Sequence, residues 1–279
     1  MTTICICGAG TMGAGIAQVC AAAGFETILY DISPETVEKA REKMNTDLEK
    51  LVEKQKMAPS KRDAVFQNIK FTSNPDDCRA QLVIEAVIEK ADVKTALFNQ
   101  LADINDKGSI FASNTSSLSI STLAKTVKRP EMLAGLHFFN PAPIMKLVEV
   151  VKGEQTPDHV IEKLVSFTRA LGKEPVLCRD APGFIVNRVA RPFYIESLRI
   201  MEEGKVVPET IDKLLEGRGF RMGPFRLMDL IGNDVNYAVS CSVYEQLGRP
   251  ERLRPSQIQK EKVEKGELGK KAGKGYYHY

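Results

Sequence analysis

One histidine and one glutamate stand in an apolar stretch where an acid–base pair could form. His137 and Glu149 lie within residues 135–151, in two apolar runs that read as strands. A reversal at the loop containing Pro141 and Pro143 would bring the two side chains toward each other. An imidazole oriented by a carboxylate is the usual arrangement for general acid–base catalysis near neutral pH. From this segment alone, a core histidine beside an outward-facing glutamate is an equally good interpretation.

The other two histidines are poorer candidates for this chemistry. His159 follows Thr156-Pro157-Asp158, a helix-start signature, so we expect a solvated residue in a first helical turn. His278 belongs to a polar tail. His137 is therefore the histidine expected to act on a substrate.

A glycine-rich turn near the N-terminus predicts a dinucleotide site. An apolar run at 3–7 precedes three glycines in the pattern GxGxxG, and a helical segment follows. In such a turn the first glycine permits the bend, the second lets the backbone approach a pyrophosphate, and the third lets helix and strand pack closely. The residues expected to contact the cofactor here are Gly8, Gly10, Thr11, Met12 and Gly13.

Asp31 ends the next predicted strand, 26–31. At this place a carboxylate would accept hydrogen bonds from the adenosine ribose hydroxyls and repel a 2′-phosphate. The following residues, Ile32-Ser33-Pro34-Glu35, contain no arginine. The turn and the acid together predict NAD(H) as the cofactor, whereas a plain strand–helix corner would not need the acid.

Strands and helices alternate through the first part of the chain, which predicts an α/β fold with a Rossmann-type, mainly parallel sheet. Residues 34–56 and 60–67 read as a helical-hairpin insertion between the second and third strands. Further strands are expected at 69–73, 82–88, 109–113, 131–138, 147–152 and 174–178, and further helices at 90–103, 119–126 and 157–171. The sheet domain is expected to span residues 1–183, with Pro182-Gly183 at the junction.

Residues 184–279 are expected to form an all-α C-terminal domain that serves substrate binding and dimerisation. Helices are predicted at 184–204, 208–217, 226–247 and 255–264. The lysine-rich end, 269–277, is expected to be a disordered basic tail rather than a segment folded over a phosphate. Apolar side chains of 184–204 are expected to contribute to a homodimer core: Phe193, Ile195, Leu198, Ile200 and Met201.

Composition limits the remaining function classes. Of 279 residues, 43% are hydrophobic and 27% charged, with a formal net charge of only +3, so we expect no nucleic-acid partner. No apolar run reaches membrane-spanning length, and we expect no leader peptide, because residues 1–8 show no basic stretch or cleavage site before the first strand. The six cysteines form no Cys-x-x-Cys pair, which favours buried thiols in a reducing, cytoplasmic compartment and no metal site.

Several longer motifs give the chain a specific resemblance. They are GAGTMGAGIAQ at 8–18, IEAVIEK at 84–90, ASNTSSLSI at 112–120, GLHFFNPAPIMKLVEVV at 135–151, DAPGFIVNR at 180–188, RMGPFRLMDLIG at 221–232 and GKKAGKGYY at 269–277. In these motifs the chain resembles the 3-hydroxyacyl-CoA dehydrogenase family from end to end, and in particular its compact bacterial 3-hydroxybutyryl-CoA members.

The resemblance implies a role for each matching residue. His137 and Glu149 match the catalytic pair, Ser116 the serine that hydrogen-bonds the substrate oxygen, and Asn187 the asparagine that completes the site from the second domain. The resemblance places further residues at the NAD site: Glu89, Lys94, Asn114, Asn140 and Lys271, for which Lys270 or Lys274 is an equally good match. It also makes Lys50 and Lys54, on the helical insertion, counterparts of coenzyme A contacts, although solvated lysines are an equally good interpretation.

The predicted function is therefore an NAD-dependent, (S)-specific dehydrogenase of 3-hydroxyacyl-CoA, acting as a homodimer on an acyl-CoA substrate. A second hypothesis keeps the fold but replaces the thioester with a free 3-hydroxy acid or a sugar acid. A third, a non-enzymatic NAD-binding role, does not need the His–Glu pair with Ser116 and Asn187.

Overall fold

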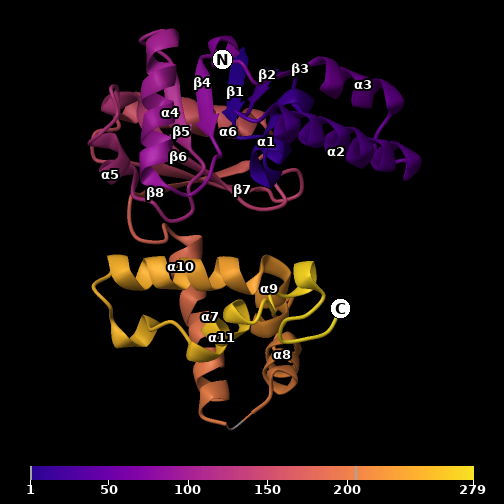
Figure 1. Cartoon of the computed structure of the whole chain (residues 1–279), viewed down its shortest axis with the longest axis vertical. Coiled ribbons are helices and arrows are strands. Elements are labelled where there is room, and N and C mark those ends of the chain that lie inside the picture. The colour runs from indigo at the N-terminus through magenta and orange to yellow at the C-terminus, as the bar shows by residue number, and fades with distance from the viewer. Residues whose placement is uncertain (1, 205) are drawn as a thin grey trace. The chain divides into compact units, whose positions relative to one another are not determined.

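An eight-stranded sheet organises the first part of the chain in this computed structural model, which describes residues 2–204 and 206–279 (Figure 1). Its order is β3-β2-β1-β4-β5-β6-β7-β8. The strands are β1 Thr3–Cys7, β2 Glu26–Tyr30, β3 Ile69–Thr72, β4 Leu82–Glu85, β5 Ile110–Ser113, β6 Leu133–Phe138, β7 Leu147–Lys152 and β8 Glu174–Arg179. Strands β4, β5 and β6 are buried along their whole length, which explains their continuous apolar runs.

The strand directions confirm the predicted fold class. β3, β2, β1, β4, β5 and β6 pair in parallel, β7 runs antiparallel to β6, and β8 pairs in parallel with β7. The helices of this part are α1 Thr11–Ala22, α2 Pro34–Glu53, α3 Pro59–Gln67, α4 Ala91–Ile104, α5 Ile120–Ala124 and α6 Asp158–Ala170. The sheet is thus a mainly parallel, Rossmann-type sheet.

Helices α2 and α3 form the predicted helical-hairpin insertion between β2 and β3 (Figure 1). Helix α2 begins where the Ser33 hydroxyl accepts a hydrogen bond from the Thr36 amide at 3.2 Å, with Pro34 in the first turn. Its buried stripe consists of Val37, Ala40, Met44 and Leu48. Most of its remaining surface is polar and charged, so α2 packs along one narrow face.

The strand predicted at 82–88 is shorter in the structure and ends at Glu85. Beyond it, the Val87 amide donates a hydrogen bond to the Glu85 carboxylate at 2.7 Å, and this bond holds the backbone in a turn. Residues 86–90 consequently form a loop that leads into α4. This loop carries Glu89, one of the predicted cofactor-site residues.

Three buried cysteines come together although they are separate in the sequence. Cys5 and Cys7 share one face of β1 with their sulfurs 3.7 Å apart, and the Cys78 sulfur lies within 4.8 Å of both. All three cysteines are free thiols. Sequence reasoning expected buried cysteines but did not place Cys78 beside the other two.

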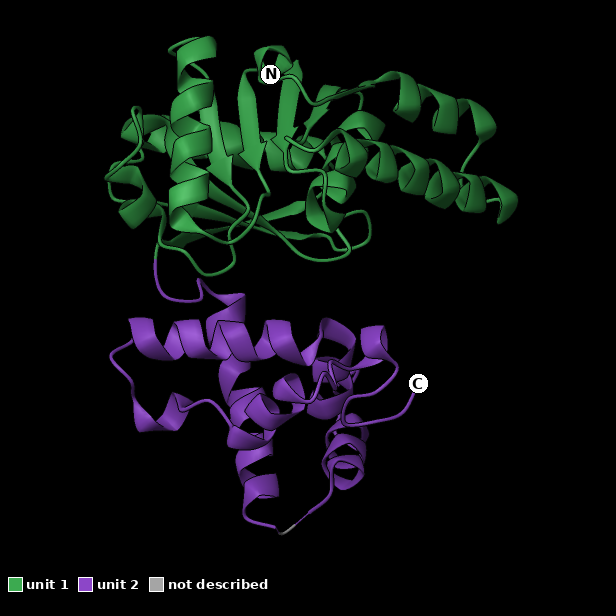
Figure 2. Ribbon diagram, viewed as in Figure 1, with its two compact units in different colours: residues 1–180 green, residues 181–279 purple. Residues whose placement is uncertain are grey.

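The chain divides into two compact units, residues 1–180 and 181–279 (Figure 2). Unit 2 is built from α7 Val186–Glu202, α8 Pro208–Gly217, α9 Pro224–Ile231, α10 Asn233–Gln246 and α11 Gln257–Glu264. None of the helices in the described part of the chain is long and apolar enough to cross a bilayer.

The apolar face expected to form a dimer core is instead largely used inside unit 2. Ile195 and Leu198 are buried, and Phe193, Ile200 and Met201 pack against a cluster that includes Phe225 and Met228. A single helix needs partners for its apolar stripe, and α9, α10 and the end of the chain supply them here. The periodicity of 184–204 was therefore a signal of the unit's own core.

The helix predicted at 226–247 is two helices. α9 ends at Ile231 and α10 begins at Asn233, because Gly232 between them adopts φ +104°. This backbone conformation is open to glycine and breaks the α-helical hydrogen-bond ladder.

The lysine-rich end is ordered, and the expectation of a disordered tail is wrong. The buried carboxylate of Asp229 accepts hydrogen bonds from the Tyr276 and Tyr277 amides, both at 2.9 Å. The Tyr277 hydroxyl donates to the buried Asp212 at 2.7 Å. Gly275 lies so close to Asp229 that an added Cβ would be 2.0 Å from its Oδ1. Backbone amides paired with buried carboxylates fold this segment, and composition does not reveal such pairs.

Candidate active site

The glycine-rich turn joins β1 to α1 in a conformation that needs its glycines. Gly8 has φ +104°, and a Cβ on it would lie 2.5 Å from the Ala86 carbonyl oxygen. A Cβ on Gly13 would lie 1.7 Å from the Gly8 oxygen. The first glycine thus allows the turn and the third allows the helix to pack on it, as expected for a dinucleotide fingerprint.

Gly10 differs from the other two, and the difference indicates a ligand. Among the described residues, a Cβ on Gly10 would meet no atom within 4 Å. Gly10 is the N-cap of α1, and no side chain in the described part of the chain caps this helix. Open space at a helix N-terminus with amides pointing outward fits a pyrophosphate, so the turn fits NAD. Thr11 and Met12 form the first turn of α1 beside this space.

Asp31 follows β2 directly and is fixed against the turn. Its Oδ2 accepts a hydrogen bond from the Ala9 amide at 2.8 Å, and its Oδ1 accepts one from the Ser33 amide at 3.0 Å. Each carboxylate oxygen retains a second lone-pair direction that can accept from a hydroxyl. The geometry therefore suits the ribose contact predicted for Asp31.

The β6–β7 hairpin places His137 directly opposite Glu149 in the antiparallel register. His137 Nδ1 lies 2.7 Å from Glu149 Oε2, and both side chains are buried, with 7% and 1% exposed. A charged or polar pair this deeply buried in two apolar strands is costly unless its members bond each other. The Pro141/Pro143 reversal predicted from the sequence is thus the connection that joins the pair, and Phe139 packs on the imidazole with ring centroids 4.5 Å apart.

The parallel register brings His137 to the same edge of the sheet as the glycine turn. Cys7 pairs with Glu85, Glu85 with Ser113, and Ser113 with Gly135. The residue after Cys7 is Gly8, and His137 lies two residues after Gly135. All these strands end at the same edge, where ligands bind in open α/β sheets.

The loop after β5 is held in place by hydrogen bonds that involve the predicted residues Asn114 and Ser116. The Asn114 side-chain oxygen accepts from the Phe138 amide at 2.8 Å, which ties the loop to the β6 strand end. The Ser116 amide donates to Glu89 Oε1 at 3.1 Å. Ser116 and Glu89 are therefore neighbours, and the Ser116 loop adjoins the strand that carries His137.

Lys94 and Glu85 form a buried ion pair, of which the sequence predicted only Lys94 as a site residue. Lys94 Nζ lies 2.6 Å from Glu85 Oε1 and 3.0 Å from Glu89 Oε2. Lys94 was predicted as a cofactor-site residue, but Glu85 was not singled out. Its signal in the sequence is an acid at the last position of a fully apolar strand, where burial requires a partner.

The remaining predicted residues lie in the loop after β6, at the end of α2 and in unit 2. Asn140 follows β6 and is exposed, in a cis peptide bond with Pro141. Lys50 and Lys54 are exposed at the C-terminal end of α2. Asn187 and Lys271 belong to unit 2: Asn187 lies in the first turn of α7, and Lys271 lies 2.7 Å from Asp234. The roles given to these residues stay predictions.

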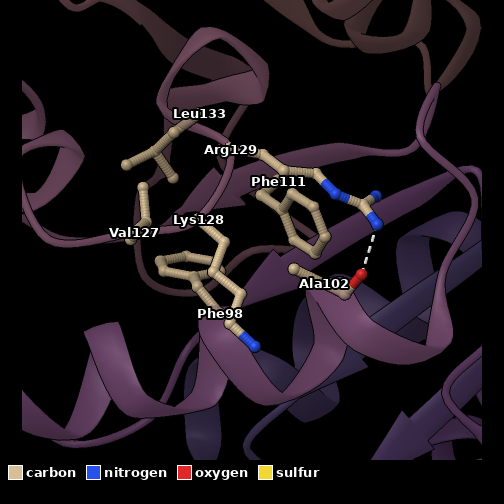
Figure 3. A pocket seen from close by; sticks show the side chains of 7 residues that line it. All are labelled: Phe98, Ala102, Phe111, Val127, Lys128, Arg129 and Leu133. Carbon is tan, nitrogen blue, oxygen red and sulfur yellow. Dashed lines mark hydrogen bonds between the residues drawn. The ribbon is translucent and has the colours of Figure 1, made fainter.

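Two hollows in unit 1 do not include His137. One, of about 10 Å³, lies between α4 and the β5 and β6 strands, beside Phe98 and Phe111 (Figure 3). It has room for at most one water molecule. The other, of about 880 Å³, is lined by Gln81 and Ser109, which precede β4 and β5, and therefore lies at the opposite edge of the sheet from the glycine turn. We therefore assign the site from its side chains and strand ends.

Comparison with known proteins follows the same division of the chain. Residues 3–181 match the family described as "3-hydroxyacyl-CoA dehydrogenase, NAD binding domain", and residues 183–279 match "3-hydroxyacyl-CoA dehydrogenase, C-terminal domain". The solved (S)-3-hydroxybutyryl-CoA dehydrogenase of Ralstonia eutropha superposes with a TM-score of 0.95 at 37% identity, covering 100% of this chain and 99% of that one.

Two curated relatives are similar over nearly the whole chain. The 3-hydroxyadipyl-CoA dehydrogenase of Escherichia coli K12 is 47% identical over 279 residues, which are 99% of this chain but only 59% of the relative. The mitochondrial hydroxyacyl-coenzyme A dehydrogenase of Sus scrofa is 40% identical over 285 residues, 99% of this chain and 90% of the relative. The chain belongs to the 3-hydroxyacyl-CoA dehydrogenase family, a family of NAD-dependent dehydrogenases, and it contains both the NAD-binding domain and the C-terminal domain of that family.

Proposed function

We propose that this chain interconverts (S)-3-hydroxyacyl-CoA and 3-oxoacyl-CoA by hydride transfer with NAD(H), with 3-hydroxybutyryl-CoA and acetoacetyl-CoA as the expected pair. The observation that supports this best is the 2.7 Å contact between His137 Nδ1 and Glu149 Oε2 at the strand ends shared with the glycine turn. A structural protein has no need for a buried acid–base pair at a cofactor edge. NAD, when bound, supplies the hydride acceptor.

The imidazole is arranged to move the hydroxyl proton of the substrate. In the neutral ring, Nδ1 donates its hydrogen to Glu149, so the lone pair resides on Nε2. Nε2 then takes the proton as the alcohol is oxidised and returns it when a carbonyl is reduced. The Glu149 carboxylate stabilises the imidazolium that forms, as the acid partner does in other His–carboxylate pairs.

Two donors are assigned to the substrate oxygen. Ser116 lies in the loop after β5, which borders the β6 strand end that bears His137. Its hydroxyl is proposed to donate to the substrate oxygen, and the Asn187 amide of unit 2 to do the same. Such donors stabilise the negative charge that develops on oxygen in the transition state.

A comparison of acceptors tests the thioester part of the proposal. We expect acetoacetyl-CoA to be reduced with a kcat/KM at least about 10²-fold above that of free acetoacetate, because binding energy from the remote coenzyme A moiety is used at the reacting carbon. NADH oxidation is followed at 340 nm over C4 to C16 3-oxoacyl-CoA substrates and a 3-oxoadipyl-CoA, with NADPH in parallel. Equal rates with acetoacetate would favour the free-acid dehydrogenase instead.

Variants of Lys50 and Lys54 provide a second test of coenzyme A binding. If they hold the coenzyme A phosphates, the double variant K50E/K54E should raise the KM for acetoacetyl-CoA about tenfold and leave kcat unchanged, because uniform binding is lost. The matched control is K107E, an exposed lysine at the amino-terminal edge of the sheet. An unchanged KM in the double variant would make both lysines ordinary solvated residues.

We also propose that the chain forms a homodimer through unit 2. Large apolar side chains stay exposed on this unit even after its core is filled: Val207, Leu214, Phe220 and Leu230. Such exposure is typical of a surface that pairs with a second copy. Sedimentation equilibrium should then give twice the chain mass of 30.9 kDa, and L214D should shift the distribution toward monomer. A monomeric wild type at micromolar concentration would contradict the dimer.

A further inference from the structure

A buried cluster of two carboxylates and one ammonium group lies at the carboxyl end of β4. Glu85 is 0% exposed and Lys94 is 1% exposed, so the inner ion pair is closed to solvent. Glu89, the outer carboxylate, has 39% of its side chain exposed. Lys94 Nζ bridges the two acids, at 2.6 Å from Glu85 and 3.0 Å from Glu89.

Both carboxylates receive further hydrogen bonds that favour their ionised forms. Glu85 accepts from the Val87 amide at 2.7 Å and from the Ser113 hydroxyl at 2.6 Å. Burial raises the pKa of Glu85, and Lys94 with these donors opposes that rise. For Glu89, burial also acts to raise the pKa, but the attraction of Lys94 and the hydrogen bonds from Lys94, Thr115 and Ser117 together outweigh it, and the pKa of Glu89 is lowered.

Glu89 is in addition tied to the loop after β5. Its Oε1 accepts from the Thr115 hydroxyl at 2.5 Å, the Ser116 amide at 3.1 Å and the Ser117 hydroxyl at 3.1 Å. The cluster therefore consists of two fixed negative charges and one fixed positive charge. One negative charge is left uncompensated, and the exposed member, Glu89, presents it outward.

The fold places this charge beside the nicotinamide half of the cofactor. In a doubly wound sheet a dinucleotide lies across the carboxyl edge, with its pyrophosphate at the N-terminus of the first helix. Asp31, after β2, marks the adenosine half on one side of β1. The nicotinamide half therefore extends to the other side of β1, over β4 and β5, where Glu89 and its partners lie.

We propose that the Glu85–Lys94–Glu89 cluster sets the relative affinity of this chain for the oxidised and the reduced cofactor. The nicotinamide ring is cationic in NAD⁺ and neutral in NADH, so a nearby excess of one negative charge stabilises NAD⁺ selectively. Glu85 is a positioning residue in this device. It holds Lys94 inward, and without its charge Lys94 would neutralise Glu89 and the excess would vanish. The inference rests on NAD binding at the carboxyl edge of the sheet.

The variant Glu85→Gln tests this role without touching the cofactor contacts. The amide keeps the shape of the side chain, and its oxygen still accepts from Lys94 and the Val87 amide while its NH₂ group donates to the Ser113 oxygen. Dissociation constants are measured separately, for NADH by fluorescence enhancement and for NAD⁺ by calorimetry. We expect NAD⁺ to bind about three- to tenfold more weakly, and NADH to change by less than about twofold, as for loss of one nearby charge.

Two further variants make the result decisive. Glu162→Gln removes an exposed carboxylate at the opposite edge of the sheet and should change neither constant. Glu89→Gln, at the half-exposed member, should shift the ratio in the same direction, and it serves as the test if Glu85→Gln does not fold. An equal loss of affinity for both cofactor forms, or no change in their ratio, would overturn the inference while leaving the dehydrogenase proposal standing. A wild type that binds neither form would refute both.

Discussion

Replacing His137 with glutamine should lower the turnover of acetoacetyl-CoA by about 10²–10⁴-fold, the usual contribution of a positioned acid–base group. Glutamine can still accept or donate a hydrogen bond, but it cannot take up the hydroxyl proton. The Kd for NADH should stay within about twofold of the wild-type value, because the hydrogen bonds that hold Asp31 against the glycine turn do not involve His137. Single-turnover kinetics and NADH fluorescence titration measure the two quantities separately.

The chain offers a matched control for this experiment. His159 is exposed in the first turn of α6, and H159Q should change turnover by less than about twofold. Glu149→Gln should also lower turnover steeply, because it leaves the imidazole in place and removes the carboxylate that fixes its tautomer. Near-normal turnover in H137Q would remove His137 from the mechanism, whatever the result for Glu149.

Alanine at Gly13 should destabilise unit 1 by about 3 kcal/mol or more, at the upper end of the range for overpacked sites. The new Cβ would lie 1.7 Å from the Gly8 carbonyl oxygen, which is backbone and cannot rotate away. Relief requires α1 to move off β1, and that movement also opens the pyrophosphate site. Thermal unfolding should therefore show a lower Tm, and calorimetry should show no NAD⁺ binding.

Gly10→Ala separates the ligand requirement from the folding requirement. A Cβ here enters open space within the described structure, so the Tm should match that of the wild type. The same Cβ stands where a pyrophosphate would approach, and we expect the Kd for NAD⁺ to rise about tenfold or more. A Gly10→Ala protein that binds NAD⁺ normally would show that the cofactor does not lie on this turn.

The sheet and its site were predictable where local patterns determine them. Continuous apolar runs with helices between them predicted the strands, and GxGxxG followed by Asp31 predicted the turn that the structure forms. The His137–Glu149 contact was predictable as well, since a short proline-containing loop between two strands leaves few registers open. In each case the information lies within a few residues of the feature.

Features that depend on distant partners were missed or misjudged. Glu85 reads as an ordinary strand end until α4 brings Lys94 to it. Gly232 lies inside a helical pattern, and only the packing of two helices shows that it separates them. The tail at 269–277 reads as disordered because its lysines are visible in the sequence, whereas the buried Asp229 that pairs with its backbone is not. Tertiary pairing decided all three.

Tyr276 and Tyr277 donate hydrogen bonds to the buried Asp229 and Asp212. The segment that carries these tyrosines therefore helps to hold unit 2 together. Without residues 276–279, Asp229 and Asp212 would lose these donors, and a buried carboxylate that loses hydrogen bonds is costly. Removal of these residues should therefore lower the Tm of unit 2. For the same reason, limited digestion of this lysine-rich stretch should be slow.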